Sequence, residues 1–169
     1  EGKVLMHEKD IKERWKVYFH NLFNDGYGYD SSSLDTREED RNYKYYRRIQ
    51  KQEVKEALKR MSNGKAVGPD NIPIEVWKTL GDRGLEWLTK LFNEIMRSKR
   101  MPEEWRRSTL VPIYKNKGDI QNCANYRGIK LMSHTMKLWE RVIERRLRKE
   151  TQVTENQFGF ISGRSTMEA

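Results

Sequence analysis

The sequence predicts an α+β fold that is predominantly helical and carries a small antiparallel β-hairpin. Several segments place apolar residues three and four positions apart, which is the spacing of one face of an α-helix. Two short runs rich in β-branched and aromatic residues, at 108–114 and 126–131, flank a polar loop and predict the hairpin. Apolar residues make up 36% of the chain, which allows a core, although a thin one.

The first elements are two amphipathic helices separated by a polar linker. A helix is expected over 10–24, with an apolar stripe of Ile11, Trp15, Tyr18, Phe19, Leu22 and Phe23. Residues 25–42 are rich in serine and mixed charges and are expected to form a mobile or surface-draped linker. The second helix is expected over 52–61.

Two more helices follow a stretch rich in glycine and proline at 62–73. Pro73 suits the first turn of a helix that turns Val76, Trp77 and Leu80 inward. Gly81 and Gly84 then bracket a short joint. The strongest helical pattern runs from 84 to 100 and is closed by Pro102.

The last part of the chain contains the hairpin and a long helix. Pro112 marks its strand as an edge strand or as the site of a bulge. The helix is expected over 133–150 and the beginning of another at 166–169. The long helix turns one apolar side inward and carries cations on another side; the apolar set is Met136, Trp139, Val142, Ile143 and Leu147, and the cations are Lys137, Arg141, Arg145 and Arg148.

The chain is basic, and the excess lies in its second part. Its 169 residues suit one domain or two small ones, and its formal net charge is +9. Residues 1–60 hold 14 basic and 12 acidic side chains, whereas residues 61–169 hold 20 and 13. Such an excess favours a polyanionic partner, usually a nucleic acid.

Several classes are excluded by what the sequence lacks. No apolar run approaches the roughly 20 residues of a membrane span, so we expect no membrane partner. One cysteine, Cys123, permits no intramolecular disulfide, which fits a reducing compartment. The first residues carry no secretory signal. Because the chain begins with Glu1 and not with methionine, we expect an excerpt from a longer protein; a boundary chosen for expression would look the same.

Two basic features are candidate binding sites. Lys115 and Lys117 in the hairpin loop and Arg127 on the returning strand form a candidate polyphosphate clamp. A solvated cationic loop is the alternative. The basic side of the last helix could follow a nucleic-acid backbone, but Glu144 and Arg148 have the spacing of an ordinary pair within a helix.

Metal and nucleophile chemistry find no support in the sequence, which predicts neither catalytic nor metal-binding residues. Cys123 and the three histidines share no metal-ligand spacing. No Gly-x-Ser-x-Gly motif is present, and neither glycine-bearing turn is a P-loop. Two-metal phosphoryl transfer needs closely placed carboxylates, yet no two aspartates are adjacent; Asp70 and Asp119 lie in separate loops.

Four motifs in order resemble the opening part of reverse transcriptases from LINE-type (non-LTR) retrotransposons. They are GKAVGPDNIP at 64–73, LVPIYKNKGD at 110–119, NYRGIKL at 125–131 and QFGFISGRS at 157–165. The stretch MSHTMKLWERVIE at 132–144 is similar to the RTE-like branch, particularly its plant members. The resemblance covers roughly residues 8–169.

The resemblance implies the fingers and the beginning of the palm of a right-hand polymerase at 51–169, preceded by a helical extension and linker at 1–50. It implies that Lys115 and Arg127, together with the neighbouring Lys117, hold the triphosphate of the incoming dNTP. Contacts to the template are expected from the turns around both Gly-rich motifs, from the returning strand and from the basic helix; the residues are Gly68, Pro69, Asp70, Asn125, Tyr126, Lys137, Arg141, Arg145, Gln157, Gly159, Phe160, Gly163 and Arg164.

Two departures from the family pattern limit this expectation. Gly128 stands where the family usually has proline after the motif arginine, which loosens the backbone but keeps the cation. In the family, the first catalytic aspartate and the Tyr-x-Asp-Asp motif come further along the palm, and neither is among these 169 residues. The expected partners are therefore an RNA template, a DNA primer, a dNTP and the missing palm and thumb, with Mg²⁺ required only in the complete enzyme.

The sequence leaves two functions open. One is the N-terminal part of an RNA-directed DNA polymerase that is inactive alone. The other is a non-catalytic nucleic-acid-binding or interaction module derived from a retroelement. From the family we expect the protein to work in the cytoplasm and the nucleus.

Overall fold

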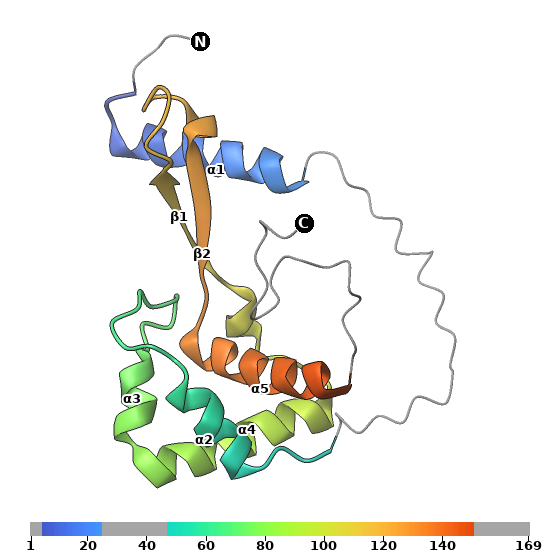
Figure 1. Ribbon diagram of the computed structural model, residues 1–169. Coiled ribbons are helices and arrows are strands. Elements are labelled where there is room, and N and C mark those ends of the chain that lie inside the picture. Colours follow the sequence, from blue (N-terminus) through green and yellow to red (C-terminus); the bar gives the residue numbers. More distant parts are fainter. Residues whose placement is uncertain (1–4, 25–46, 151–169) are drawn as a thin grey trace, which may run out of the picture. The chain divides into compact units, whose positions relative to one another are not determined.

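The computed structural model describes residues 5–24 and 47–150, and it confirms a predominantly helical α+β fold with a two-stranded antiparallel sheet (Figure 1). One short 3₁₀ turn, Glu103–Arg106, precedes β1, and another, Cys123–Asn125, ends the hairpin loop directly before β2. The elements are α1 (Glu8–Asn24), α2 (Lys51–Lys59), α3 (Ile74–Thr79), α4 (Gly81–Ser98), β1 (Thr109–Tyr114), β2 (Tyr126–Leu131) and α5 (His134–Glu150).

The chain divides into two compact units. The first combines Glu1–Arg41 with Thr109–Leu131, so that it contains α1 and the hairpin. The second combines Asn42–Ser108 with Met132–Ala169 and contains the other four helices. The functional division of the chain at residue 50 stays a prediction, as does the assignment of the part after it to fingers and palm.

The helical unit is built around one apolar core. Helix α2 packs on α3, α4 and α5, and α3 packs on α4. Phe92, Leu88, Ile74, Val54 and Leu138 are completely buried, each contributing about 1.5–3 kcal/mol of hydrophobic stabilisation. The predicted apolar stripe of α4 therefore faces this core.

Two sequence predictions about inward residues in this unit were wrong. Helix α3 has only six residues, and α4 begins directly after Leu80. One short turn buries Ile74 and Trp77, while Val76 and Leu80 remain 42% and 50% exposed. On α5, Leu147 is exposed and Arg146 is buried in its place.

The hairpin unit pairs one helix with two strands. Six consecutive residue pairs run from Thr109↔Leu131 to Tyr114↔Tyr126, so Pro112 lies in an edge strand without a bulge. A two-stranded sheet is narrow and covers only the middle of the stripe on α1. Phe19 is buried, whereas Ile11, Leu22 and Phe23 remain exposed. The predicted linker at 25–42 and the helix start at 166–169 lie outside the described residues.

Candidate functional site

Helix α1 covers one face of the hairpin. The ring of Trp15 meets Tyr126 edge to face at 4.7 Å between centroids, and the ammonium of Lys130 lies 4.6 Å from the centre of the Phe23 ring. Phe19 packs over Gly128 between them. Because successive side chains of a strand point to opposite faces, these contacts place residues 126, 128 and 130 on the covered face.

Two of the predicted triphosphate cations, Lys115 and Arg127, belong to the opposite face. Arg127 is exposed and pairs with Ile113, which is itself 51% exposed. The amide of Lys115 donates to the carbonyl oxygen of Asn125 at 2.8 Å, which extends the ladder by one step. Lys115 therefore continues the alternation and shares the face of Ile113 and Arg127. A diagonal pair of this kind is about 7–8 Å apart at Cα.

The loop at 115–125 is held together by its own hydrogen bonds. The hydroxyl groups of Tyr114 and Tyr126 donate to the carbonyl oxygens of Gly118 (2.5 Å) and Ile120 (2.9 Å). The side-chain amide of Asn125 donates to the carbonyl oxygen of Asp119 at 2.8 Å. Asn125 and Tyr126 thus shape the loop, and their proposed contacts with a template remain predictions.

The two loop lysines differ in whether a hydrogen bond fixes the position of the ammonium group. The Lys115 ammonium donates to the carbonyl oxygen of Ala124 at 2.8 Å, so its position is set by the loop. Lys117 is exposed and makes no hydrogen bond or ion pair among the described residues.

Packing against α1 and β1 explains why residue 128 is a glycine. A Cβ at this position would lie 2.6 Å from Cε1 of Phe19 and 3.1 Å from Cδ1 of Leu110. The missing side chain therefore makes the space in which α1 meets the sheet. This space accounts for a glycine at position 128.

The Gly68–Asp70 turn is packed against the beginning of α5. A Cβ on Gly68 would lie 2.5 Å from both the carbonyl carbon of Met132 and the amide nitrogen of Ser133. Asp70 accepts a hydrogen bond from the Ser133 hydroxyl at 2.6 Å. Pro69 between them is exposed. The turn therefore has a packing role, and its contact with a template remains a prediction.

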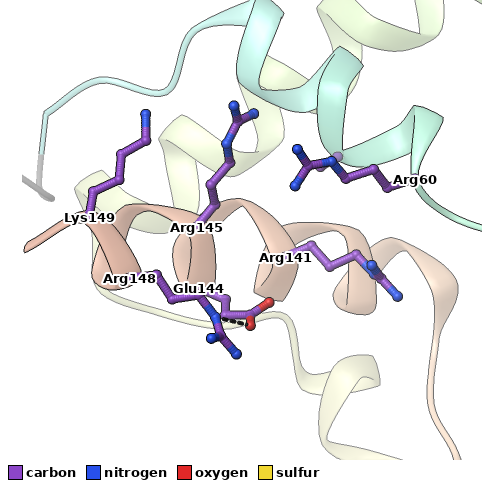
Figure 2. A pocket seen from close by; sticks show the side chains of 7 residues that line it. Arg60, Arg141, Glu144, Arg145, Arg148 and Lys149 are labelled. Carbon is purple, nitrogen blue, oxygen red and sulfur yellow. Dashed lines mark hydrogen bonds and ion pairs between the residues drawn. The ribbon is translucent and has the colours of Figure 1, made fainter. Parts of the chain in front are cut away.

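The basic side of α5 forms a groove with the end of α2 (Figure 2). This cationic groove has a volume of about 400 Å³, and its lining residues are Ala57, Arg60, Arg141, Glu144, Arg145, Arg148 and Lys149. Five of the seven are cationic and one is a carboxylate. Of the predicted template residues, Arg141 and Arg145 line the groove, and Lys137 does not. Sequence reasoning missed Arg60, since nothing local relates the end of α2 to the side of α5.

Ion pairs occupy part of this basic side. Arg148 pairs with Glu144 at 2.7 Å, as their spacing predicted, and Arg145 pairs with Glu56 of α2. The side chains of Arg60, Arg141 and Lys149 make no hydrogen bond or ion pair with other described residues. These three are therefore available to an anionic ligand.

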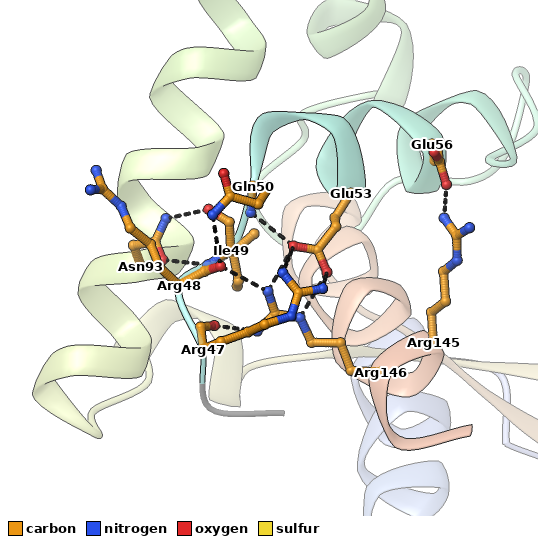
Figure 3. A network of polar contacts seen from close by, with 9 residues as sticks. All are labelled: Arg47, Arg48, Ile49, Gln50, Glu53, Glu56, Asn93, Arg145 and Arg146. Atoms are coloured by element: carbon orange, nitrogen blue, oxygen red, sulfur yellow. Dashed lines mark hydrogen bonds and ion pairs between the residues drawn. The ribbon is translucent and has the colours of Figure 1, made fainter. Parts of the chain in front are cut away.

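A buried arginine next to the groove was also missed by sequence reasoning (Figure 3). The Arg146 guanidinium donates to both carboxylate oxygens of Glu53, at 2.9 and 2.7 Å, and to the carbonyl oxygens of Arg47 and Arg48. This Arg146 clamp fixes the segment before α2 to α5. The Asn93 amide holds the same segment from α4 through the backbone of Ile49.

The Glu53 carboxylate of the Arg146 clamp has a lowered pKa, so it stays ionised at more acidic pH than an ordinary glutamate. Burial raises the pKa of Glu53, but the hydrogen bonds from Arg146 and from the Gln50 amide, with the charges of Arg146 and Arg47, outweigh it. The pKa of Glu53 therefore lies below its ordinary value of 4.5.

Part of the predicted site lies outside the described residues. These are Gln157, Gly159, Phe160, Gly163 and Arg164. Within residues 5–24 and 47–150, no cluster of three or more His, Cys, Asp or Glu side chains is placed to hold a metal ion. Among the helices described there, none has the length and apolar character of a membrane span.

Comparison with known proteins relates the chain to polymerases of mobile elements. The probable RNA-directed DNA polymerase from transposon BS of Drosophila melanogaster is 33% identical over 124 residues, which are 71% of this chain and 14% of that protein. The probable RNA-directed DNA polymerase from transposon X-element of the same organism is 35% identical over 120 residues, 69% of this chain and 13% of that protein. The RNA-directed DNA polymerase from mobile element jockey of Drosophila melanogaster is 28% identical over 113 residues, which are 64% of this chain and 12% of that protein.

The chain is thus a distant homologue of the reverse transcriptases of non-LTR retrotransposons. The matched segment spans about an eighth of the length of these relatives. No protein-family model matches the chain.

Proposed function

We propose that this chain forms the fingers and the beginning of the palm of an RNA-directed DNA polymerase from an RTE-like non-LTR retrotransposon. In this role it contacts the triphosphate of the incoming dNTP and the RNA template with its DNA primer, and it is not catalytic alone. The relation to transposon polymerases supports the reaction class. The resemblance of residues 132–144 supports the branch.

One observation carries the proposed triphosphate contact. Lys115 and Arg127 share the hairpin face that α1 leaves open, on adjacent strands. An ammonium has three donors, so the Lys115 ammonium keeps two after its bond to the loop carbonyl. A guanidinium adds a bidentate contact with phosphate oxygens. Two such cations neutralise the charge of the β- and γ-phosphates, which is the electrostatic share of phosphoryl transfer.

The test is a titration of the ¹⁵N-labelled chain with dTTP, in which amide chemical shifts are measured by NMR. We expect the largest chemical-shift changes at residues of the open hairpin face. Lys115→Ala and Arg127→Ala should each weaken dTTP binding by about tenfold or more, because a charge-assisted hydrogen bond contributes roughly 1.5–3 kcal/mol. Lys130→Ala is the matched control, since it removes the same charge from the same strand on the covered face.

The outcomes separate the proposed functions. Equal losses for Lys130→Ala and Arg127→Ala would contradict a defined clamp. An RNA–DNA primer-template that binds while dTTP causes no shifts would favour the non-catalytic binding module instead. With Mg²⁺, primer-template and all four dNTPs, we expect the pure chain to extend no primer. Extension would overturn the assignment of the catalytic residues to another part of the enzyme.

A further inference from the structure

The cationic groove carries more positive charge than its internal pairs compensate. It contains four arginines and one lysine around about 400 Å³, with Glu144 as the lone carboxylate in the lining. Placing like charges around one space costs electrostatic free energy, and a bound polyanion recovers that cost. The groove therefore has the charge of an anion-binding surface.

The available cations come from both walls of the groove. Arg60 is the residue that closes α2, and Arg141 lies on α5; both are exposed and make no pair among the described residues. Arg145 is held in place by Glu56 on the opposite wall. A ligand in the groove would thus meet two guanidiniums that have no partner among the described residues and, one turn further along α5, an arginine whose direction is already set.

The length of the groove favours a chain of phosphates over a single one. At 1.5 Å per residue, the α5 positions from 141 to 149 extend about 12 Å along the helix axis. One strand of a stacked nucleic acid places a phosphate about every 3.4 Å. A strand lying along α5 would pass several phosphates in front of these cations, whereas one inorganic phosphate would reach only one or two of them.

We propose that the groove between α2 and α5 binds the phosphodiester backbone of a nucleic-acid strand, with Arg60 and Arg141 as its principal contacts. This inference rests on the proposed polymerase function, because that function is the reason for choosing a nucleic acid as the ligand. It adds Arg60 and Lys149 to the interface and excludes Lys137. Arg145 acts there as a positioned secondary contact, because Glu56 already neutralises it.

The first test measures binding of the full chain to fluorescein-labelled oligouridine by anisotropy at several salt concentrations. We expect Arg60→Gln/Arg141→Gln to lower affinity by at least about tenfold at low salt. The slope of log affinity against log salt should become shallower by about 1.4, since each lost single-strand contact removes about 0.7. Arg83→Gln/Arg107→Gln is the matched control: both arginines are exposed, lie outside the groove and have no ion pair with residues 5–24 or 47–150.

The second test raises the charge of the groove instead of lowering it. Glu144→Gln removes the carboxylate from the groove lining and with it one partner of Arg148. We expect oligouridine affinity to rise about three- to tenfold, because the negative charge that repels a phosphate backbone and offsets the groove cations is gone. Glu94→Gln is the matched control, because Glu94 forms a similar pair with Arg97 on α4. Both single variants are surface changes and should keep the fold.

The outcomes decide the inference separately from the proposed function. It is overturned if the groove and control variants behave alike, if inorganic phosphate or polyglutamate displaces oligouridine at the same charge concentration, or if only hairpin variants reduce RNA binding. Oligo-dT competition indicates whether DNA shares the surface. The dTTP titration of the hairpin is independent of these variants, so failure of the groove leaves the triphosphate assignment standing, and the reverse also holds.

Discussion

Replacing Arg146 by methionine should destabilise the helical unit far more than removing a similar surface pair. The Arg146 side chain is 5% exposed and donates to Glu53 and to two backbone carbonyl oxygens. Losing one partner of a buried ion pair costs about 3–5 kcal/mol. Because Glu53 keeps some hydration and the Gln50 amide, we expect the lower end, about 3 kcal/mol.

Urea unfolding followed by tryptophan fluorescence measures this loss, since Trp77 and Trp105 lie in the core of the same unit. The control is Arg97→Met. Arg97 donates to both oxygens of Glu94, at 3.0 and 2.7 Å, but its side chain is 78% exposed. An exposed pair contributes about 0.2–1 kcal/mol, so the control should shift the midpoint only slightly, with an unchanged denaturant slope.

The same pair predicts a dependence on pH. The folded-state pKa of Glu53 lies below its ordinary value of 4.5, so its ionised form stabilises the fold above that value. This stability is lost as the pH falls through the folded-state pKa. The difference between the wild-type chain and Arg146→Met should therefore narrow in acid. Equal losses for Arg146→Met and Arg97→Met, or a difference that does not change with pH, would refute the reasoning.

Two glycine substitutions test the packing roles found in the predicted motifs. Gly68→Ala should destabilise the chain to urea by about 3 kcal/mol, because its Cβ meets the Met132–Ser133 backbone, whereas Gly64→Ala meets nothing within 4 Å and should cost about 1 kcal/mol for its positive φ alone. Equal losses would contradict the packing argument. Gly128→Ala should speed amide hydrogen exchange in β2 by about tenfold, and Phe19→Leu should recover part of that protection; an unchanged exchange rate would contradict the contact.

Local sequence pattern predicted which elements form. The period of apolar residues placed α1, α2, α4 and α5 to within a few residues of their bounds. The two β-rich runs around a polar loop predicted the hairpin and its antiparallel pairing. These properties depend on residues close together in the chain, so a sequence contains them directly.

The pattern failed where neighbouring elements decide which face is covered. Val76 and Leu80 have helical spacing, but α3 ends after six residues and exposes them. Arg146 is an arginine that the sequence analysis did not count among the inward residues of α5, and it is buried because the segment before α2 supplies carboxylate and carbonyl partners. No local rule relates α5 to a segment almost a hundred residues away.

The features of the candidate site also fall into two groups, those that local sequence determined and those that tertiary packing determined. The sequence by itself determined the candidate hairpin cations, the basic side of α5 and the relation to polymerases of mobile elements, since motifs and helical spacing are local. Only the tertiary structure decided that Lys115 and Arg127 share an open face, that Arg60 joins Arg141 in one groove, and that Gly68 and Gly128 are glycines because other segments occupy the space of a side chain. Such contacts arise when distant segments pack, and packing depends on the whole set of buried surfaces at once.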